Sequence, residues 1–388
     1  MKRWLQGLLP LLLLGLLLLF LFSFGPLGIF QTGSQPLEEL TLERIVLPKA
    51  HQMVVHVVNG GPDPVTVAQV MVDDAIWFFT TESNNQTIPR LGRIKINIPY
   101  PWVEGEPHKV TILTSTGLTF SGEVSIAIQS LVVGWTYLTS FSLLGIYAGV
   151  IPVFLGLFWY PFLRGLDRRW LDFCLSLTVG LLSFLAVDTL SEAFEIASMV
   201  PGAFQGLSIV SIGLLGTVFL LLYLGQRRPI RADKGTREGR KWTALLIALG
   251  IGLHNLGEGL AIGSAYSQGE IALGTFLVVG FTLHNLTEGL GIVAPIAVDN
   301  PTLGWLALMG VLAGAPTVLG TLIGGISYSP VWSTLFLAVG AGAILEVIYE
   351  IGRLVGNQSQ GQWASGYNLS GFILGLMIMY VTGLFIIA

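Results

Sequence analysis

Residues 243–297 read TALLIALGIGLHNLGEGLAIGSAYSQGEIALGTFLVVGFTLHNLTEGLGIVAPIA, two long apolar runs with very little charge. A helix of about 20 apolar residues crosses the hydrocarbon core of a bilayer, and both runs are long enough to do so. Each run carries one signature, HNLGEGL at His254–Leu260 and HNLTEGL at His284–Leu290, with six of seven positions identical. The stretch therefore predicts two membrane-spanning helices that repeat one motif.

The histidine and the glutamate of each motif are four residues apart, so both side chains lie on one face of their helix. In antiparallel neighbours the two imidazoles are expected at one depth, with the carboxylates displaced toward opposite membrane faces. His254, Glu258, His284 and Glu288 thus predict a four-ligand site for Zn²⁺, Fe²⁺, Mn²⁺ or a similar ion. The alternative is a helix-pairing motif in which histidine and glutamate hydrogen-bond each other.

Asn255 and Asn285 follow the two histidines by one residue, which turns them about 100° around the helix. Two interpretations are open for these amides. They line a second ion position that shares Glu258 and Glu288, or they form hydrogen bonds between helices.

Further apolar stretches of spanning length flank this pair, so that eight spans are predicted, at 138–162, 171–199, 204–225, 243–267, 270–297, 302–326, 331–352 and 370–388. Residues 136–388 are therefore expected to form an all-α, eight-helix polytopic membrane domain. Basic residues gather at Arg164–Arg169 and in the 226–241 loop, so the positive-inside rule places both segments in the cytoplasm and the C-terminus outside.

Only 11% of the 388 residues are charged and 53% are hydrophobic, whereas about a quarter of a soluble domain is charged. This composition excludes a soluble enzyme, a disordered chain and a nucleic-acid binder. Outside its two basic loops the membrane part keeps ten charges. Nine are acidic, namely Asp188, Glu192, Glu195, Glu258, Glu270, Glu288, Asp299, Glu346 and Glu350, and the tenth is the base Arg353. Glu270 and Asp299 sit at span ends, which leaves seven carboxylates at membrane depth.

Carboxylates within a membrane are costly, and they usually line a pathway or pair with a cation. Asp188, Glu192 and Glu195 follow one helix face, and Glu346 and Glu350 form a second pair four residues apart. We interpret both groups as steps of a cation pathway. The alternatives are protonated carboxyls or an ion pair with Arg353.

Residues 36–130 differ from the rest, because short β-branched runs alternate with turn signals such as Asn59–Pro62 and Pro99–Pro101. The pattern predicts an extracytoplasmic β-sandwich, with strands at Arg44–Leu47, Met53–Val58, Val65–Val72, Ile94–Ile98, Lys109–Leu113 and Val124–Ile128. The histidines of this segment lack a ligand spacing and are predicted to be surface or pairing residues: His51, His56 and His108. Dimerisation as a homodimer, metal gathering and partner docking are open roles.

The N-terminal segment 1–30 carries Lys2, Arg3 and an apolar run from Leu8 to Phe24, which fits a signal peptide or an uncleaved anchor. An anchor is favoured because no A-x-A-like site follows. Cys174 is the single cysteine, so the chain forms no internal disulfide and no cysteine-based zinc site.

The paired motifs, the spans and the basic loop resemble the ZIP (Zrt/Irt-like) divalent-metal transporters, in particular their bacterial branch, over Tyr137–Ala388. The resemblance implies a metal centre between spans four and five and uptake toward the cytoplasm. It also implies an elevator-like motion of spans one, four, five and six against spans two, three, seven and eight. Carried over by motif, the two histidines and two glutamates form the primary site, and Asn255 and Asn285 contribute to a second.

Three departures from that family matter. Gly257 and Thr287 stand where relatives often have proline. Ala315 precedes Pro316 where two-metal relatives have a glutamate, which favours a single transported ion. The anchor and the β-domain are additional to the bacterial core.

We therefore expect a multi-pass cell-membrane transporter for a divalent metal, zinc first and iron, manganese or cadmium as alternatives. The metal is cargo rather than cofactor, and the chain is not expected to be an enzyme or to bind nucleic acid. Because coordination needs neutral histidines, transport should weaken below about pH 6.5. The alternatives are an intramembrane zinc-dependent hydrolase, although no HExxH pattern occurs, and a sensor with a structural metal site.

Overall fold

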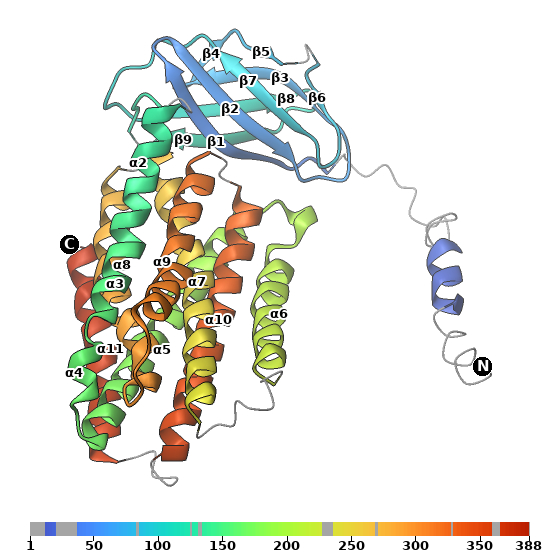
Figure 1. Ribbon diagram of the computed structural model, residues 1–388. Coiled ribbons are helices and arrows are strands. Elements are labelled where there is room, and N and C mark those ends of the chain that lie inside the picture. The colour runs from blue at the N-terminus through green and yellow to red at the C-terminus, as the bar shows by residue number, and fades with distance from the viewer. Residues whose placement is uncertain are drawn as a thin grey trace. The chain divides into compact units, whose positions relative to one another are not determined.

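Figure 1 shows the computed structural model, which describes residues 12–20, 37–82, 85–124, 126–130, 134–226, 236–267, 271–326, 329–358 and 365–387. Met1–Glu38 and Glu39–Ala388 are two separate units. In the first unit, residues 12–20 are helical and their leucine and phenylalanine side chains are exposed. The remainder of the predicted 1–30 anchor lies outside the described residues.

Residues 40–124 form the predicted β-domain, in two antiparallel sheets. The strands are β1 (Leu40–Lys49), β2 (Gln52–Asn59), β3 (Val65–Val72), β4 (Ala75–Trp77), β5 (Thr80–Thr81), β6 (Thr87–Ile88), β7 (Arg93–Ile98), β8 (His108–Thr114) and β9 (Thr119–Val124). One sheet has the order β1-β2-β7-β5 and the other β4-β3-β8-β9, with β6 paired to β3. Alternate residues of both sheets, such as Val55, Ile96, Val70 and Ile112, share one buried core.

The sequence pattern did not predict two hairpins of this domain, β3–β4 and β8–β9. Asp73 and Asp74 join β3 to β4 with positive φ at both residues, which is the type I′ geometry that suits a two-residue hairpin. Gly117, at φ +94°, turns β8 into β9, so the last strand is Thr119–Val124 and the predicted Val124–Ile128 is wrong. The glycine turn, rather than the later β-branched run, sets the position of that strand.

The helical part follows from Trp135 onward, and each predicted span corresponds to a helix or a set of helices. They are α2 (Trp135–Gly145), the π-helical turn η1 (Ile146–Val150), α3 (Ile151–Leu157), α4 (Tyr160–Arg164), α5 (Arg168–Ser198), η2 (Gly202–Phe204), α6 (Gly206–Gln226), α7 (Arg237–Ser267), α8 (Ile271–Val293), η3 (Ala294–Ile296), α9 (Leu303–Ile326), α10 (Pro330–Gln358) and α11 (Gly366–Ile387).

Within the described ranges, seven helical stretches are long and apolar enough to cross a membrane, and α11 is a further apolar helix over Gly366–Val381. The helical membrane part and the N-terminal β-sheet domain confirm the predicted fold class. The first span is broken into α2, η1, α3 and α4. Pro152 explains the π turn, because a proline lacks the N–H that the carbonyl of Ala148 would accept in a regular helix.

Glycines set how closely the helices approach each other. A methyl group added to Gly259 of α7 would lie 2.2 Å from the Thr317 carbonyl oxygen and 2.9 Å from Cα of Gly320 in α9. One added to Gly289 of α8 would lie 2.3 Å from the Val153 carbonyl oxygen and 2.8 Å from Cα of Gly156 in α3. The pairs α7–α9 and α3–α8 therefore pack backbone against backbone, as small residues allow in membranes.

Strand β1 contacts the ends of these helices. The Arg44 guanidinium donates hydrogen bonds to the carbonyl oxygens of Ser267 (3.3 Å) and Ile326 (3.4 Å), the last residues of α7 and α9. The Glu39 carboxylate accepts one from the Gly202 amide at 2.7 Å. A cation at two helix C-termini is electrostatically favourable, so Arg44 stabilises both ends.

Candidate metal centre

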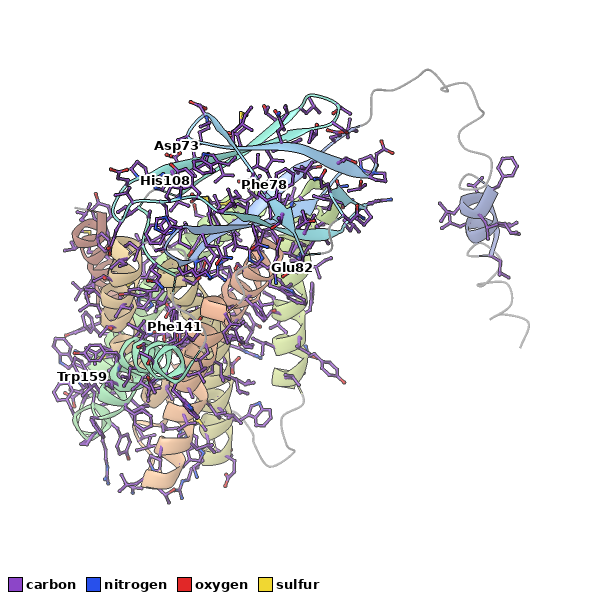
Figure 2. All side chains as sticks on the ribbon, turned by 90° about the horizontal axis from the view of Figure 1, so that it is seen from above. Asp73, Phe78, Glu82, His108, Phe141 and Trp159 are labelled. Atoms are coloured by element: carbon purple, nitrogen blue, oxygen red, sulfur yellow. The ribbon has the colours of Figure 1, made fainter. Side chains whose placement is uncertain are left out.

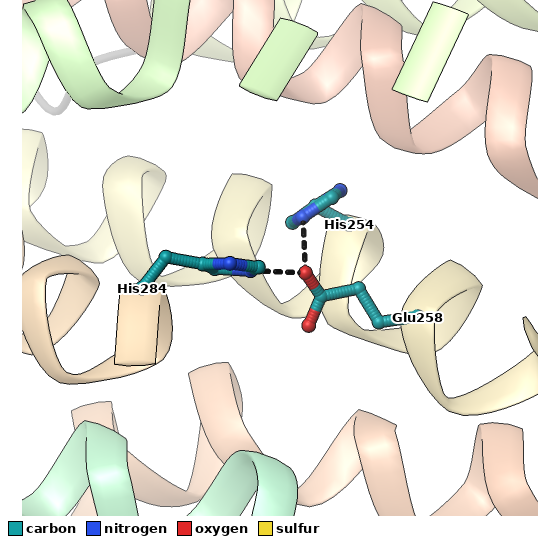
Figure 3. A group of neighbouring side chains, drawn as sticks. All are labelled: His254, Glu258 and His284. Carbon is teal, nitrogen blue, oxygen red and sulfur yellow. Dashed lines mark hydrogen bonds and ion pairs between the residues drawn. The ribbon is translucent and has the colours of Figure 1, made fainter. Parts of the chain in front are cut away.

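Glu258 of α7 lies between the imidazoles of His254 and His284 (Figure 3). Its Oε1 is 2.8 Å from Nε2 of His254, one helical turn earlier, and it also forms a short contact with Nε2 of His284 on α8. The ring centroids of the two histidines are 6.2 Å apart. All three side chains are buried, with exposed fractions of 2–6%. Their ligand atoms lie within 4.8 Å of one another, which is close enough to hold one metal ion.

The second glutamate of the repeat stands apart from these three residues. The sequence predicts that Glu258 and Glu288 bracket the histidines from opposite sides, whereas in the structure Glu258 lies between the imidazoles and Glu288 is outside the three-residue group. Glu288 is 2% exposed, and neither of its carboxylate oxygens has a hydrogen-bond partner among the described residues. It lines a small space together with His284 and Thr287.

The asparagines tie the two motif helices to their neighbours. The Asn255 amide donates to the carbonyl oxygen of Ala313 in α9 at 3.0 Å, and the Asn285 amide donates to that of Ala148 in η1 at 2.9 Å. Asn285 also donates to Oε2 of Glu258 at 3.1 Å. Both Oδ1 atoms are buried without a partner among the described residues, so interhelical bonding leaves each amide oxygen available to a cation.

The two motifs use their residues in parallel ways. In both, the asparagine bonds a carbonyl three or four residues before a helical proline, Pro316 in one case and Pro152 in the other. In both, the last glycine packs on a glycine further along the same neighbouring span, Gly320 in α9 for Gly259 and Gly156 in α3, which follows η1, for Gly289. The repeated signature therefore places histidine and glutamate toward the centre and asparagine and glycine toward a partner helix. The many glycines of the membrane part predict close helix packing in general, but the sequence analysis did not single out these two, although their presence in both motifs was the signal.

Asp188, Glu192 and Glu195 of α5 line one cavity of about 780 Å³. Its wall also contains Gly257, the residue before Glu258, and Ser264. The three carboxylates predicted to follow one helix face thus line a cavity that extends to Gly257, next to the metal-centre residue Glu258. The three carboxylates differ in exposure, since Glu192 is half-buried and the other two are exposed.

Glu346 and Glu350 of α10 are both buried, with exposed fractions of 3% and 8%. The Thr243 hydroxyl of α7 lies 3.3 Å from Oε1 of Glu350 and donates to it. These two glutamates are not among the residues that line the acidic cavity. The structure therefore does not bring this second predicted group together with Asp188, Glu192 and Glu195.

An ion pair joins the N-terminal end of α7 to the connection between α8 and α9. The Arg240 guanidinium donates to both carboxylate oxygens of Asp299, at 2.9 and 2.6 Å, and Asp299 is 6% exposed. Asp299 was predicted only as a residue at a span end. Sequence reasoning missed its partner because the two residues are far apart along the chain. Four bases of the predicted 226–241 loop, Arg227, Arg228, Arg231 and Lys234, lie outside the described residues.

In the β-domain, His108 pairs with a carboxylate, as its prediction allowed. Oδ2 of Asp73 lies 2.8 Å from Nδ1 of His108 and 2.7 Å from the Tyr100 hydroxyl, and Oδ1 accepts the Lys109 amide (Figure 2). Partial burial opposes ionisation of Asp73, but these hydrogen bonds outweigh it and lower its pKa. Burial and the bond to Asp73 raise the pKa of Tyr100 to about 12.

Residues 225–383 match the family model described as ZIP Zinc transporter, which covers α7 to α11 and both motifs. No curated protein matches the chain. Members of that family move divalent metal ions as substrates, which agrees with a buried His/Glu centre in a multi-pass membrane protein. From the end of α6 to near its C-terminus, the chain is therefore similar to the ZIP zinc transporters.

Proposed function

We propose that the protein moves a divalent transition metal, zinc in the first place, into the cytoplasm through a site formed by His254, Glu258, His284 and Glu288. The observation that carries the proposal is the excess of acceptors in the buried centre. Glu258 and Glu288 are each 2% exposed, and among the described residues no lysine or arginine forms an ion pair with them. A buried carboxylate is costly without a cation, and a divalent metal would supply that charge.

The three-residue group fits a tetrahedral ion with little movement. Zinc bonds of about 2.0–2.1 Å place neighbouring ligand atoms roughly 3.4 Å apart. Nε2 of His254 and Oε1 of Glu258 are 2.8 Å apart, so the ligands would open by about half an ångström around the ion. Each Nε2 must present a lone pair, so binding requires that this nitrogen lose its proton or pass it to Nδ1.

The acidic cavity supports the entry route. Asp188, Glu192 and Glu195 would attract a hydrated cation and lead it toward Gly257 and the centre. The buried pair Glu346 and Glu350 would act on the exit side, once the centre opens to the other face. Alternating exposure of one midplane site is the usual scheme of secondary transporters.

The proposed orientation rests on charge placement. Arg164, Arg168 and Arg169 end the first span and begin the second, and Arg237, Arg240 and Lys241 begin the fourth. Alternating spans place these groups on one side, and an excess of bases marks the cytoplasmic side. The β-domain and the C-terminus would then be extracytoplasmic.

We further propose one ion per transport cycle. Asn255 and Asn285 are already engaged through their amide nitrogens, and Ala315 offers no side-chain ligand beside Pro316. A second ion would have to rely on Glu288 and the two Oδ1 atoms. Elemental analysis of zinc-saturated protein would give a ratio near one under this proposal and near two against it.

Zinc flux into proteoliposomes that contain a zinc-sensitive dye tests the function. The double variant His254→Ala/His284→Ala is expected to abolish flux and to lower zinc binding. His51→Asn is the matched control, because this exposed histidine lies in a turn at positive φ that asparagine adopts readily. Competition by iron, manganese and cadmium would rank the cargo.

Unchanged flux in the double variant would show that the histidines do not carry the metal. Zinc binding without flux, together with release of a peptide or lipid product, would favour the hydrolase alternative. Zinc that moves only from the cytoplasmic face of the protein to the opposite face would contradict the proposed direction of transport.

A further inference from the structure

An apolar cavity of about 480 Å³ lies away from the metal centre, between α4, α5, α8 and α11. Trp159 and Phe162 form one side of it, and Trp170 and Cys174 form another. Trp159 lies at the periphery of the helical part (Figure 2), and the three aromatic side chains of this rim are 50–63% exposed. The cavity therefore opens outward, where lipid surrounds a membrane protein.

The lining offers almost no hydrogen-bonding capacity. Thr287 contributes a hydroxyl, but this group donates to the carbonyl oxygen of His284 in its own helix at 2.6 Å. Cys174 contributes a free thiol, which is a weak donor. An occupant of this cavity must consequently be hydrocarbon, and the volume falls within the roughly 300–1,000 Å³ of ordinary ligand pockets.

The mouth of the cavity has the features of a membrane–water interface. The Trp170 ring makes edge contacts with Phe173 and with Tyr367, at centroid distances of 5.6 and 5.8 Å. Tryptophan and tyrosine concentrate at the depth of lipid headgroups. The inner end, lined by Leu177 and Ile378, continues toward the hydrocarbon region.

Three arginines lie close in sequence to the aromatic residues of this mouth. Arg164 ends α4, and Arg168 and Arg169 begin α5, all three exposed. The carboxylates of the same segment are fewer, with Asp167 exposed and Asp172 buried. In the described part of the chain no salt bridge within 4.0 Å engages Arg164 or Arg169. The N-terminus of α5 adds its own attraction for an anion.

We propose that this cavity binds one anionic glycerophospholipid. An acyl chain lies among Trp170, Cys174 and Leu290, and the phosphate lies against the three arginines. A neutral lipid would fill the apolar part but leave the guanidinium groups facing no net negative charge. The arginines therefore favour a lipid with an anionic headgroup, while the apolar cavity accommodates its acyl chain.

A lipid in this cavity would affect the metal centre through α8, which carries His284 and Glu288 and forms part of the cavity wall. Thr287 and Leu290 line the cavity from α8, and Glu288 lies between them in sequence. A bound chain would contact the turn of α8 that carries this carboxylate. The lipid site itself does not depend on the proposed direction or cargo.

Cys174 gives a direct test, because it is the only cysteine of the chain and lies in the cavity wall. The full-length protein is placed in nanodiscs of phosphatidylcholine with or without phosphatidylglycerol, and its alkylation by N-ethylmaleimide is followed by mass. Phosphatidylglycerol is expected to slow alkylation of the wild-type protein. Arg164→Gln/Arg168→Gln/Arg169→Gln should remove the slowing, and Arg90→Gln, an exposed base of the β-domain, should keep it.

Native mass spectrometry of protein released from equimolar lipid provides the second readout. Phosphatidylglycerol should remain bound in preference to phosphatidylcholine, and each arginine removed should weaken retention about five-fold. Equal alkylation in both lipids would overturn the proposal. Slowing that persists in the triple variant would also overturn it, since membrane surface potential alone would then explain the effect. Equal retention of both lipids would reduce the cavity to an unselective lipid contact.

Discussion

Gly259→Ala is expected to destabilise the protein, whereas Gly257→Ala, two residues earlier in the same motif, is not. An alanine methyl at Gly259 would lie 2.2 Å from the Thr317 carbonyl oxygen and 2.9 Å from Cα of Gly320. At Gly257 the nearest atom would be the Phe336 carbonyl oxygen at 3.6 Å, an ordinary contact. The pair thus compares one substitution with and without a backbone clash.

The magnitude follows from the gap that must open. Normal contact requires roughly 3.4 Å or more between carbon and oxygen, so α7 and α9 would have to separate by about 1 Å at Gly259. Overpacking of this kind costs about 1–3 kcal/mol, and both substitutions gain up to about 1 kcal/mol of helix propensity. Gly257→Ala should therefore be neutral or slightly stabilising, and Gly259→Ala should be about 1–3 kcal/mol less stable than Gly257→Ala, because the propensity gain is common to both.

Thermal denaturation of the two full-length variants in one detergent is the first assay, and zinc flux is the second. Gly259→Ala should denature at a lower temperature and also lose flux, because the clash displaces the neighbouring Glu258. Gly289→Ala should behave in the same way, since its methyl would lie 2.3 Å from the Val153 carbonyl oxygen. If Gly259→Ala denatures at the same temperature as Gly257→Ala, the backbone contact between α7 and α9 is wrong.

Three further predictions concern other contacts. Asn285→Ala should weaken zinc binding about 10–100-fold in equilibrium dialysis, because Asn285 orients Glu258, while Asn255→Ala should have a smaller effect; equal losses would refute this difference. Arg240→Lys should lower the denaturation temperature more than Arg237→Lys, since only Arg240 makes a two-pronged bond to a buried carboxylate, and equal shifts would contradict it. The lowered pKa of Asp73 means that its contribution to stability is complete above the unfolded pKa of about 3.8 and is lost as pH falls through the lower folded pKa. Amide-exchange protection of residues 108–114 should fall over that acidic range in the wild type and change less in Asp73→Asn; identical pH profiles would refute the role of this carboxylate.

Much of the architecture was predictable because it depends on local sequence. A long apolar run must bond its backbone internally, so a helix is the outcome for α5 to α11 whatever their neighbours are. Alternation of β-branched residues similarly located β2, β3, β7 and β8. The misplaced last strand and the broken first span both arose from single residues, Gly117 and Pro152, whose effect depends on backbone geometry rather than on hydropathy.

The sequence predicted which residues form the candidate site, but not how they are arranged. The repeat and its spacing brought the histidines and glutamates to one face of each helix, but spacing leaves open how each helix is rotated toward its neighbours. In the structure that rotation places Glu258 between both imidazoles and Glu288 beside them. The acidic residues show the same limit, because Asp188, Glu192 and Glu195 share a cavity that Glu346 and Glu350 do not line.

The sequence by itself determined that this protein crosses a membrane many times, carries a separate β-domain and repeats a His/Glu motif in two adjacent helices. These properties follow from hydrophobicity and periodicity, which act within one segment. Only the tertiary structure decided that the motif's asparagines and glycines bind partner helices, and that one glutamate joins both histidines. Those outcomes depend on contacts between residues far apart in the chain, where packing of backbone against backbone selects a single arrangement.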